Sequence, residues 1–275
     1  MNKTLYLSDL DGTLLRPDEQ ISEYTASAIN RFIRDGGCFS YATARSFVTA
    51  SKVTQALNVE FPAICYNGAF IVDSKTGKPL HSVQGFSENE AKYAFEILNS
   101  RGIYPIVYSL IDGAEKFSYI NKFVSPEMRS FLESRKGDPR ERVVNTVDEL
   151  YAGDKFNFTC IDTEVNLSPL HDVFKRNGRF ICMYAKDIYS PESQWLGLDP
   201  INATKAVAAL RVKEMLACER LVVFGDNIND IPMFEIADEC YAVANAVPQL
   251  KDIATGIIGG NDEDGVAKFL ETAMR

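Results

Sequence analysis

Short apolar runs and segments with helically spaced apolar residues alternate through the first part of the chain. The runs are rich in β-forming residues and have the length of strands. The first longer segment has Ser22 as an N-cap and Gly36 as a stop signal. This alternation predicts a parallel sheet with helices on its faces, and such sheets bind ligands at the carboxyl ends of their strands. The predicted strands are 4–7, 38–43 and 63–66, and the predicted helices are 22–35 and 46–57.

The middle third of the chain has a different rhythm, because several strands follow one another without a helix between them. Ser87 and Glu90 form a capping box at the start of a helix. Ser168 and Pro169 predict the start of another helix, as an N-cap followed by proline in the first turn. The predicted strands are 70–73, 80–83, 103–110, 117–120, 156–161 and 179–184, and the predicted helices are 87–100, 126–134 and 168–177.

From about Trp195 the alternation of helices and strands returns. Asn202 is a candidate N-cap for a helix that has Lys205 in its first turn. We therefore expect an α/β fold: a Rossmann-like core of three layers around a central parallel sheet, with the middle third inserted as an α+β cap. The predicted core is 1–83 and 193–275 and the predicted cap is 84–192; the last predicted elements are helices 202–216 and 263–275 and strands 221–224, 240–244 and 256–258.

The charge of the chain limits the partners that it can attract. Its 29 basic and 38 acidic residues give a formal net charge of −9, which argues against a broad surface for nucleic acid or anionic membrane. A small anionic ligand remains compatible, because a metal ion or a few donors can reverse the field inside a pocket. With 275 residues, of which 46% are hydrophobic, the chain can bury a sizeable core.

The six cysteines indicate a reducing compartment. No two of them form a C-x-x-C pair, and several adjoin apolar residues in strand-like runs, so we expect buried, reduced thiols. Asp9 interrupts the first apolar stretch, which argues against a signal peptide. No uncharged apolar run approaches the roughly 18 residues of a membrane span. We therefore expect a cytoplasmic protein, and the sequence leaves its oligomeric state open.

Polar residues follow strands or begin helices at four places. Asp9 and Asp11 end the first strand, where two carboxylates at the edge of a core are costly unless a cation or hydrogen-bond donors meet them. Each cluster alone also has an ordinary explanation: Asp-Gly is a common turn, a threonine can cap a helix, and a lone lysine is usually solvated. The other three clusters are Thr43, Lys205, and Asp226 with Asn229 and Asp230.

Together the four clusters resemble a known set of motifs. Asp-x-Asp-Gly-Thr at 9–13, Thr43 after a strand, Lys205 at a helix start and Gly-Asp-x-x-Asn-Asp at 225–230 resemble the haloacid dehalogenase-like (HAD) superfamily of phosphatases. The inserted middle segment resembles the Cof-type branch, which carries an α+β (C2B) cap. The likeness covers essentially the whole core and is only topological in the cap. Further matching segments are 67–69, 229–233, 243–246 and 264–266.

The resemblance implies that a phosphate ester is cleaved in two steps. Asp9 would be the nucleophile and would form an aspartyl-phosphate intermediate. Asp11 would be the general acid that protonates the leaving oxygen, and then the base that activates water. Because residues two apart on an extended segment point to the same side, both carboxylates could face one phosphoryl group.

The same resemblance implies a magnesium ion. Mg²⁺ prefers oxygen ligands; Asp9 and Asp226 would bind it through their carboxylates and Asp11 through its backbone carbonyl. Lys205 would offset the charge that develops on the phosphoryl group, and Asp230 would orient Lys205 or a water molecule on the metal. The other implied phosphate-binding residues are Leu10 and Ala44, through backbone N–H groups, and Thr43 and Asn229.

One position departs from the family pattern. Ala44 stands where related chains commonly have glycine after the motif threonine. Alanine would be strained if this position needs a positive φ, and harmless if it is an ordinary helix-start position; we favour the second interpretation. Arg45 and Asn67 are possible substrate contacts, although a solvated or cap-facing side chain is an equal alternative for Arg45.

The leading hypothesis is a Mg²⁺-dependent phosphatase that hydrolyses a small phosphorylated metabolite, with sugar phosphates as the first candidates. A phosphosugar mutase, which transfers the phosphoryl group to another hydroxyl, would use the same core. A third hypothesis is a catalytically silent module that binds a phosphorylated metabolite. The intact clusters argue against that module, because loss of turnover usually erases an acid or the lysine.

Overall fold

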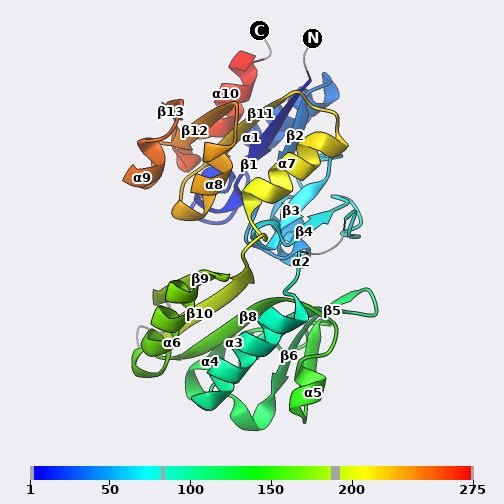
Figure 1. The fold of residues 1–275 in the computed structure, drawn as a ribbon. Coiled ribbons are helices and arrows are strands. Elements are labelled where there is room, and N and C mark those ends of the chain that lie inside the picture. The colour runs from blue at the N-terminus through cyan, green and yellow to red at the C-terminus, as the bar shows by residue number, and fades with distance from the viewer. Residues whose placement is uncertain (1–2, 82–83, 187–192, 274–275) are drawn as a thin grey trace. The chain divides into compact units, whose positions relative to one another are not determined.

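The chain folds into two compact units in a computed structural model, which describes residues 3–81, 84–186 and 193–273. Unit 1 combines both ends of the chain, residues 1–83 and 203–275, and unit 2 is the continuous segment 84–202. Each unit has its own main sheet and its own core. Figure 1 shows the helices and strands of each unit.

Unit 1 is built on a five-stranded parallel sheet with the order β13-β12-β11-β1-β2. β1 lies between β2 and β11, so the first strand of the chain pairs with a strand about 200 residues later. Five consecutive residues of β11 are buried, which requires that both faces of the sheet are covered. This confirms the predicted α/β core. The strands are β1(Thr4–Ser8), β2(Cys38–Tyr41), β11(Arg220–Gly225), β12(Glu239–Val243) and β13(Gly256–Ile258).

The helices of unit 1 pack in pairs, α1 against α10 and α7 against α8. Ser22 caps α1 as predicted, since its side chain accepts a hydrogen bond from the Thr25 N–H. The predicted cap of α7 was wrong: Thr204, not Asn202, is the N-cap, so Lys205 is the first residue of the helix. The helices are α1(Glu23–Arg34), α2(Phe47–Val53), α7(Lys205–Met215), α8(Ile231–Glu235), α9(Pro248–Lys251) and α10(Gly265–Ala273).

The third predicted strand does not extend the parallel sheet as expected. β3(Ala63–Cys65) pairs with β4(Phe70–Val72) in an antiparallel, two-stranded sheet, and it meets the end of β2 only through an isolated bridge between Ala42 and Ile64. The predicted strand 80–83 was wrong at its two described residues, Leu80 and His81, which are bends. An isolated bridge joins Val72 to Pro79, just before them, and residues 82 and 83 lie outside the described residues.

Unit 2 is a six-stranded mixed sheet with the order β7-β6-β5-β8-β10-β9. Its neighbouring strands are antiparallel except for β6 and β7, which are parallel. The strands are β5(Ile106–Ile111), β6(Ala114–Ile120), β7(Glu141–Val144), β8(Asp154–Thr163), β9(Phe180–Lys186) and β10(Ser193–Pro200), and the helices are α3(Glu88–Ser100), α4(Pro126–Ser134), α5(Val147–Leu150) and α6(Glu164–Asn177).

Helices cover the two faces of this sheet unequally. α3 and α6 pack on one face, where Leu98 and Phe174 join a core cluster with Phe158 of β8. The shorter α4 packs on the other face, where Met128 and Leu132 join a smaller cluster. The face that carries α4 therefore has less helical cover.

Two predictions in this region were wrong. Residues 193–202, which we assigned to the core, belong to unit 2, because β10 pairs with both β8 and β9. α6 begins at Glu164 rather than near Ser168, so Pro169 lies inside the helix. Gly178 ends α6 in a left-handed conformation, φ 68°, as its position after Asn177 predicted.

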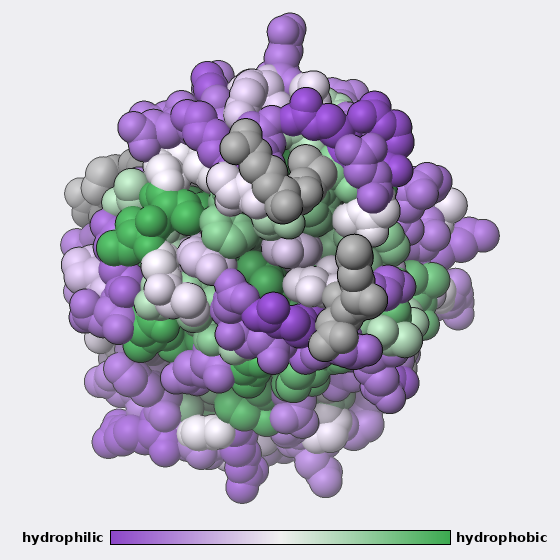
Figure 2. Space-filling model, turned by 90° about the horizontal axis from the view of Figure 1, so that it is seen from above, coloured by the Kyte–Doolittle hydropathy of each residue, from purple (hydrophilic) through white to green (hydrophobic). Residues whose placement is uncertain are grey.

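The surface and the thiols agree with the composition. The face shown in Figure 2 is mainly hydrophilic, with separate hydrophobic areas. No disulfide joins any of the six cysteines, and five of them are buried. Among the described residues, no helix has the length and apolarity needed to cross a membrane.

Candidate active site

The end of β1 places Asp9 at the edge of the parallel sheet. Its carboxylate is buried, with the residue only 5% exposed. The backbone fixes it, because the Asp9 N–H donates to the Phe224 carbonyl of β11 at 3.0 Å. The Ser8 hydroxyl donates to the Asp9 carbonyl at 2.7 Å. A negative charge thus lies inside the core, as the sequence predicted for the end of this strand.

The chain turns sharply after Asp9 and does not continue as a strand. Leu10–Leu14 forms one irregular helical turn, in which Gly12 has a φ of 77°. A Cβ on Gly12 would lie 2.4 Å from Asp226 Oδ2, so glycine is needed both for the backbone conformation and for this close approach. The extended geometry that we used to place Asp9 and Asp11 side by side is therefore absent.

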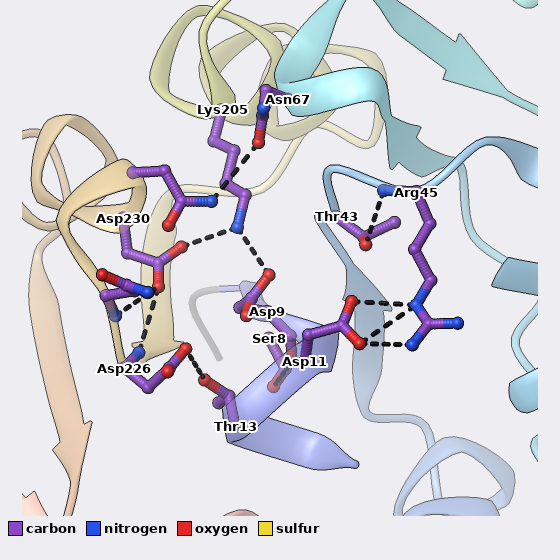
Figure 3. A network of polar contacts seen from close by, with 12 residues as sticks. Ser8, Asp9, Asp11, Thr13, Thr43, Arg45, Asn67, Lys205, Asp226 and Asp230 are labelled. Carbon is purple, nitrogen blue, oxygen red and sulfur yellow. Dashed lines mark hydrogen bonds and ion pairs between the residues drawn. The ribbon is translucent and has the colours of Figure 1, made fainter. Parts of the chain in front are cut away.

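Asp11 faces Arg45 rather than the buried acids (Figure 3). Its carboxylate accepts hydrogen bonds from Arg45 Nε at 3.0 and 2.9 Å and a further one from Nη2. The Asp11 side chain is half exposed, in contrast to Asp9. The two carboxylates of the motif thus occupy different environments.

Lys205 joins three parts of the chain from inside the core. Its Nζ donates to Asp9 Oδ1 at 2.5 Å and to Asp230 Oδ1 at 2.7 Å. The lysine side chain is completely buried. The residue before the lysine, Thr204, lies against the backbone of Gly68, which has a φ of 110°. Only glycine allows this approach, because a Cβ at Gly68 would lie 2.1 Å from the Thr204 carbonyl oxygen. Lys205 is therefore not the solvated lysine of the ordinary explanation.

Asp230 holds both Lys205 and the loop after β11. Its second oxygen, Oδ2, accepts from the backbone N–H groups of Asp226 at 3.0 Å and Asn227 at 3.2 Å. Asp226 is less buried, and its Oδ1 accepts a hydrogen bond from the Thr13 hydroxyl at 3.1 Å. The loop thus presents one acid to the lysine and another to the turn after Asp9.

The crowding of these acids changes their protonation equilibria. Burial raises the pKa of Asp9, and nearby Asp230 raises it further, while Lys205 lowers it. Burial and Asp230 also raise the pKa of Asp226. Burial alone would lower the pKa of Lys205, but its two carboxylate partners outweigh burial and raise it. A second cation would relieve the repulsion that remains among the acids.

The donor set of this cluster suits a hard divalent cation. Asp9, Asp226 and Asp230 each offer a carboxylate oxygen, and these oxygens lie within 4.8 Å of one another. All of these groups are oxygen ligands, which Mg²⁺ prefers. The expected ligand atom of Asp11 is its backbone carbonyl, and that expectation remains a prediction.

Thr43, Ala44 and Arg45 form the loop at the end of β2. Thr43 is fully buried, and its Oγ1 accepts from the Arg45 N–H at 3.0 Å. Ala44 is exposed and does not have a positive φ, which confirms that alanine is unstrained there. Arg45 also pairs with Glu19 at 2.8 Å, so its guanidinium lies between two carboxylates.

The loop after β3 carries Asn67 in an uncommon backbone conformation. Tyr66 and Asn67 have φ values of 50° and 52°, which non-glycine residues seldom adopt. Asn67 Oδ1 accepts from Asn229 Nδ2 at 3.3 Å, linking this loop to the one after β11. Both predicted ligand-contacting amides thus lie together, while Leu10 is buried beside Asp9.

Sequence reasoning missed several residues that shape the site. Thr13 belongs to the motif at 9–13, so its position could have indicated its contact with Asp226. Asn245 lies in the matching segment 243–246, and its Nδ2 donates to the Gly12 carbonyl at 2.7 Å. Glu19 gave no signal, because it lies in a polar turn outside the motifs.

Comparisons with known proteins agree with this geometry. The model of the haloacid dehalogenase-like hydrolase family matches residues 6–270. The chain is 26% identical to a Bacillus subtilis 5-amino-6-(5-phospho-D-ribitylamino)uracil phosphatase, YitU, over 96% of this chain and 94% of that protein. It is also 26% identical to the pyridoxal phosphate phosphatase YbhA of Escherichia coli, over 95% of each chain.

A solved structure shares the whole fold. TM0651 from Thermotoga maritima matches with a TM-score of 0.78 and 26% identity, over 99% of this chain and 97% of that one. The family model, the relatives and the buried acid–lysine cluster lead to the same conclusion. The chain belongs to the haloacid dehalogenase-like hydrolase family.

Proposed function

We propose that the protein hydrolyses the phosphate ester of a small phosphorylated metabolite, with Asp9 as the nucleophile and Mg²⁺ as the cofactor. The Asp9 carboxylate carries this proposal. It is buried at a strand end, held by Lys205 and close to two further carboxylates. A fixed carboxylate can attack phosphorus directly, and a neighbouring ammonium can offset the charge that develops there.

In the first step, an oxygen of Asp9 forms a bond to phosphorus, and the bond between phosphorus and the ester oxygen breaks. The departing oxygen takes its proton from the carboxyl group of Asp11. Lys205, fixed by Asp230 at 2.7 Å, lies next to the Asp9 oxygen that attacks and can reach the phosphoryl oxygens as charge accumulates on them.

In the second step, water forms a bond to phosphorus, the bond to Asp9 breaks, and Asp11 accepts the proton of the water. Asp11 is paired with Arg45, so its carboxyl group must turn from Arg45 toward the reacting oxygen during the cycle. Arg45 keeps its other partner, Glu19, when Asp11 turns away.

The acidic cluster is where we place the metal. Asp9 and Asp226 would hold it through carboxylate oxygens, and Asp11 would do so through its backbone carbonyl. When bound, Mg²⁺ supplies positive charge that reduces the repulsion between these carboxylates and a phosphate dianion. The all-oxygen donor set supports this choice.

The names of the relatives support a small substrate. A phosphorylated ribitylaminouracil and pyridoxal phosphate are the compounds in those names, and we propose a sugar phosphate or a similar compound for this chain. Cysteines that form no disulfide support a reducing compartment, so we propose that the protein is cytoplasmic.

The substitution Asp9→Asn tests the proposal, since it keeps the shape of the side chain and removes the nucleophile. The purified variant should hydrolyse 4-nitrophenyl phosphate in the presence of Mg²⁺ at least about a thousandfold more slowly than wild type. Asp18→Asn, at an exposed turn of the same unit, is the matched control and should retain full activity. Activity in Asp9→Asn at the level of the control would exclude Asp9 as nucleophile.

A further inference from the structure

The loop after β12 lies at the same edge of the unit 1 sheet as the proposed metal site. Residues 244–247 follow β12 directly, and the Ala246 N–H closes a tight turn by donating to the Val243 carbonyl at 2.9 Å. β12 pairs with β11, and β11 pairs with β1, all in parallel. The carboxyl ends of these strands therefore share one edge, which brings the loop close to Asp226 and to the turn after Asp9.

Asn245 reaches from this loop to the turn after Asp9. Its Nδ2 donates to the Gly12 carbonyl oxygen at 2.7 Å. Neighbouring strands lie about 4.8 Å apart, so the contact crosses the end of β11 and joins loops that follow strands about 10 Å apart. Asn245 is exposed, so its side chain contributes hydrogen bonds rather than core packing.

The other end of the Asn245 amide is also occupied. Its Oδ1 accepts from the Asn261 N–H at 3.0 Å, and Asn261 Nδ2 donates to the Leu15 carbonyl oxygen at 2.7 Å. Asparagine is common in turns because its side chain can bond to its own backbone, but both of these side chains bond to other loops. Two asparagines thus hold the turn after Asp9, one at Gly12 and one at Leu15.

The loop after β12 also holds the other side of the acidic cluster. The Val247 N–H donates to the Asp226 carbonyl oxygen at 2.9 Å. One short loop therefore bonds to the backbone of both segments that carry proposed metal ligands, at Gly12 and at Asp226. The spacing between these two segments depends on this loop.

The backbone of the turn makes the Asp11 carbonyl sensitive to Asn245. Asp11 and Gly12 have non-helical φ/ψ values of −72°/122° and 77°/−6°, so the turn is not a regular helix. The Gly12 carbonyl is one peptide group further along the chain than the Asp11 carbonyl. A hydrogen bond that fixes the first therefore limits the direction of the second, which is a proposed metal ligand.

We propose that Asn245 is a positioning residue of the magnesium site, which holds the Asp11 carbonyl in place relative to the Asp226 carboxylate. This inference rests on the proposed function. Asn245 contacts neither the metal nor the substrate in this assignment, and it acts through Gly12. Mg²⁺ demands nearly octahedral geometry, so a small displacement of one ligand lowers its affinity.

The substitution Asn245→Ala removes both hydrogen bonds of the amide and leaves the core intact. Isothermal titration calorimetry with Mg²⁺ alone should give a dissociation constant about three- to tenfold above that of wild type, as expected for the loss of a hydrogen bond between neutral groups. Asn261→Ala keeps the bond from Asn245 to Gly12, so its effect should be smaller. Gln249→Ala is the matched control, since it truncates an exposed amide in α9, and it should bind Mg²⁺ like wild type.

Two further measurements separate positioning from a general loss of structure. Without metal, the melting temperature of Asn245→Ala should lie within about 3 °C of that of wild type, because the side chain is exposed. At saturating Mg²⁺, its KM for 4-nitrophenyl phosphate should stay within about twofold of wild type, because Asp9 and Asp230 hold the phosphate-binding Lys205. The Mg²⁺ concentration that gives half-maximal activity should rise with the dissociation constant.

The possible failures concern different claims. Equal Mg²⁺ affinity in Asn245→Ala and Gln249→Ala would refute the positioning role and leave the proposed phosphatase function intact. A lower melting temperature with unchanged Mg²⁺ affinity would also refute it, because Asn245 would then act on the fold alone. Failure of wild type to bind Mg²⁺ and to hydrolyse 4-nitrophenyl phosphate would refute the proposed function, and this inference with it.

Discussion

Replacing Asp230 by asparagine should weaken unit 1 and slow the reaction, although Asp230 is not proposed to touch the substrate. Its carboxylate accepts three hydrogen bonds, from Lys205 Nζ at 2.7 Å and from the backbone N–H groups of Asp226 and Asn227 at 3.0 and 3.2 Å. An amide of the same shape has one acceptor oxygen, so it must direct its NH₂ group either at the ammonium or at the two N–H groups.

The cost follows from burial and charge. Asp230 is 0% exposed, so water cannot replace the lost acceptor. Removing one partner from a buried ion pair costs about 3–5 kcal/mol. Relief of the repulsion between Asp230 and Asp9 returns part of this, so we expect a loss of about 3 kcal/mol in the free energy of unfolding. A less well oriented Lys205 should lower kcat by about 10–100-fold.

Urea unfolding without metal, followed by circular dichroism, measures the loss. The single tryptophan, Trp195, lies in β10 of unit 2, so its fluorescence reports the unit that the substitution does not touch, and its transition should move less. Asp252→Asn alters an exposed acid of unit 1 and should change the free energy of unfolding by less than about 0.5 kcal/mol. If Asp230→Asn matched this control in stability and in kcat, Asp230 would not hold Lys205 in place.

Three further predictions concern the metal and the titrating groups. Gly12→Ala should lower Mg²⁺ affinity and kcat/KM by about tenfold or more, because a Cβ at this position, with its φ of 77°, would lie 2.4 Å from Asp226 Oδ2. A titration of the activity with magnesium measures this affinity. An affinity equal to that of wild type would contradict the prediction. Chelation by EDTA should abolish hydrolysis, and added Mg²⁺ should restore it; activity that survives exhaustive chelation would refute the metal requirement. The folded state binds the Asp199 proton more tightly, with a pKa of about 6 against about 3.9 for an unfolded aspartate, so its stabilising contribution is complete below pH 4 and is lost as the pH rises through 6. Urea unfolding should therefore show that wild type loses up to about 3 kcal/mol relative to Asp199→Asn between pH 4 and pH 7, whereas parallel pH profiles would show that Asp199 does not titrate in this way.

Local signals in the sequence predicted the helix starts that a single side chain determines. Ser22 and the capping box of Ser87 and Glu90 both form as expected, because a cap involves residues three positions apart and little else. The same reasoning gave the wrong start for α6. Its start is set by the end of β8, where Thr163 pairs with Ser193 of β10, and that tertiary contact is invisible in the local sequence.

The pairing of strands was the second feature that the sequence did not predict. The segment 193–200 has a glycine, a proline and polar residues, so it lacks the composition of a strand, yet it pairs on both sides in unit 2. The candidate site was easier, since acids and a lysine at strand and helix ends must find partners once buried. The direction of Asp11 was not predictable, because it depends on the turn at Gly12 and on the position of Arg45.

The pairing of β1 with β11 has a consequence for how the protein is made. Leu5 is opposite Leu221 in the sheet, so one side of the first strand waits for a partner that the ribosome adds 216 residues later. At about 5–20 residues per second, this delay is about 10–40 s. Unit 2 is the continuous segment from residue 84 to 202, so it is synthesised during this delay and is complete only shortly before β11. The nascent chain therefore keeps an open, apolar edge of the first strand through most of its synthesis, and such an edge favours aggregation until β11 covers it.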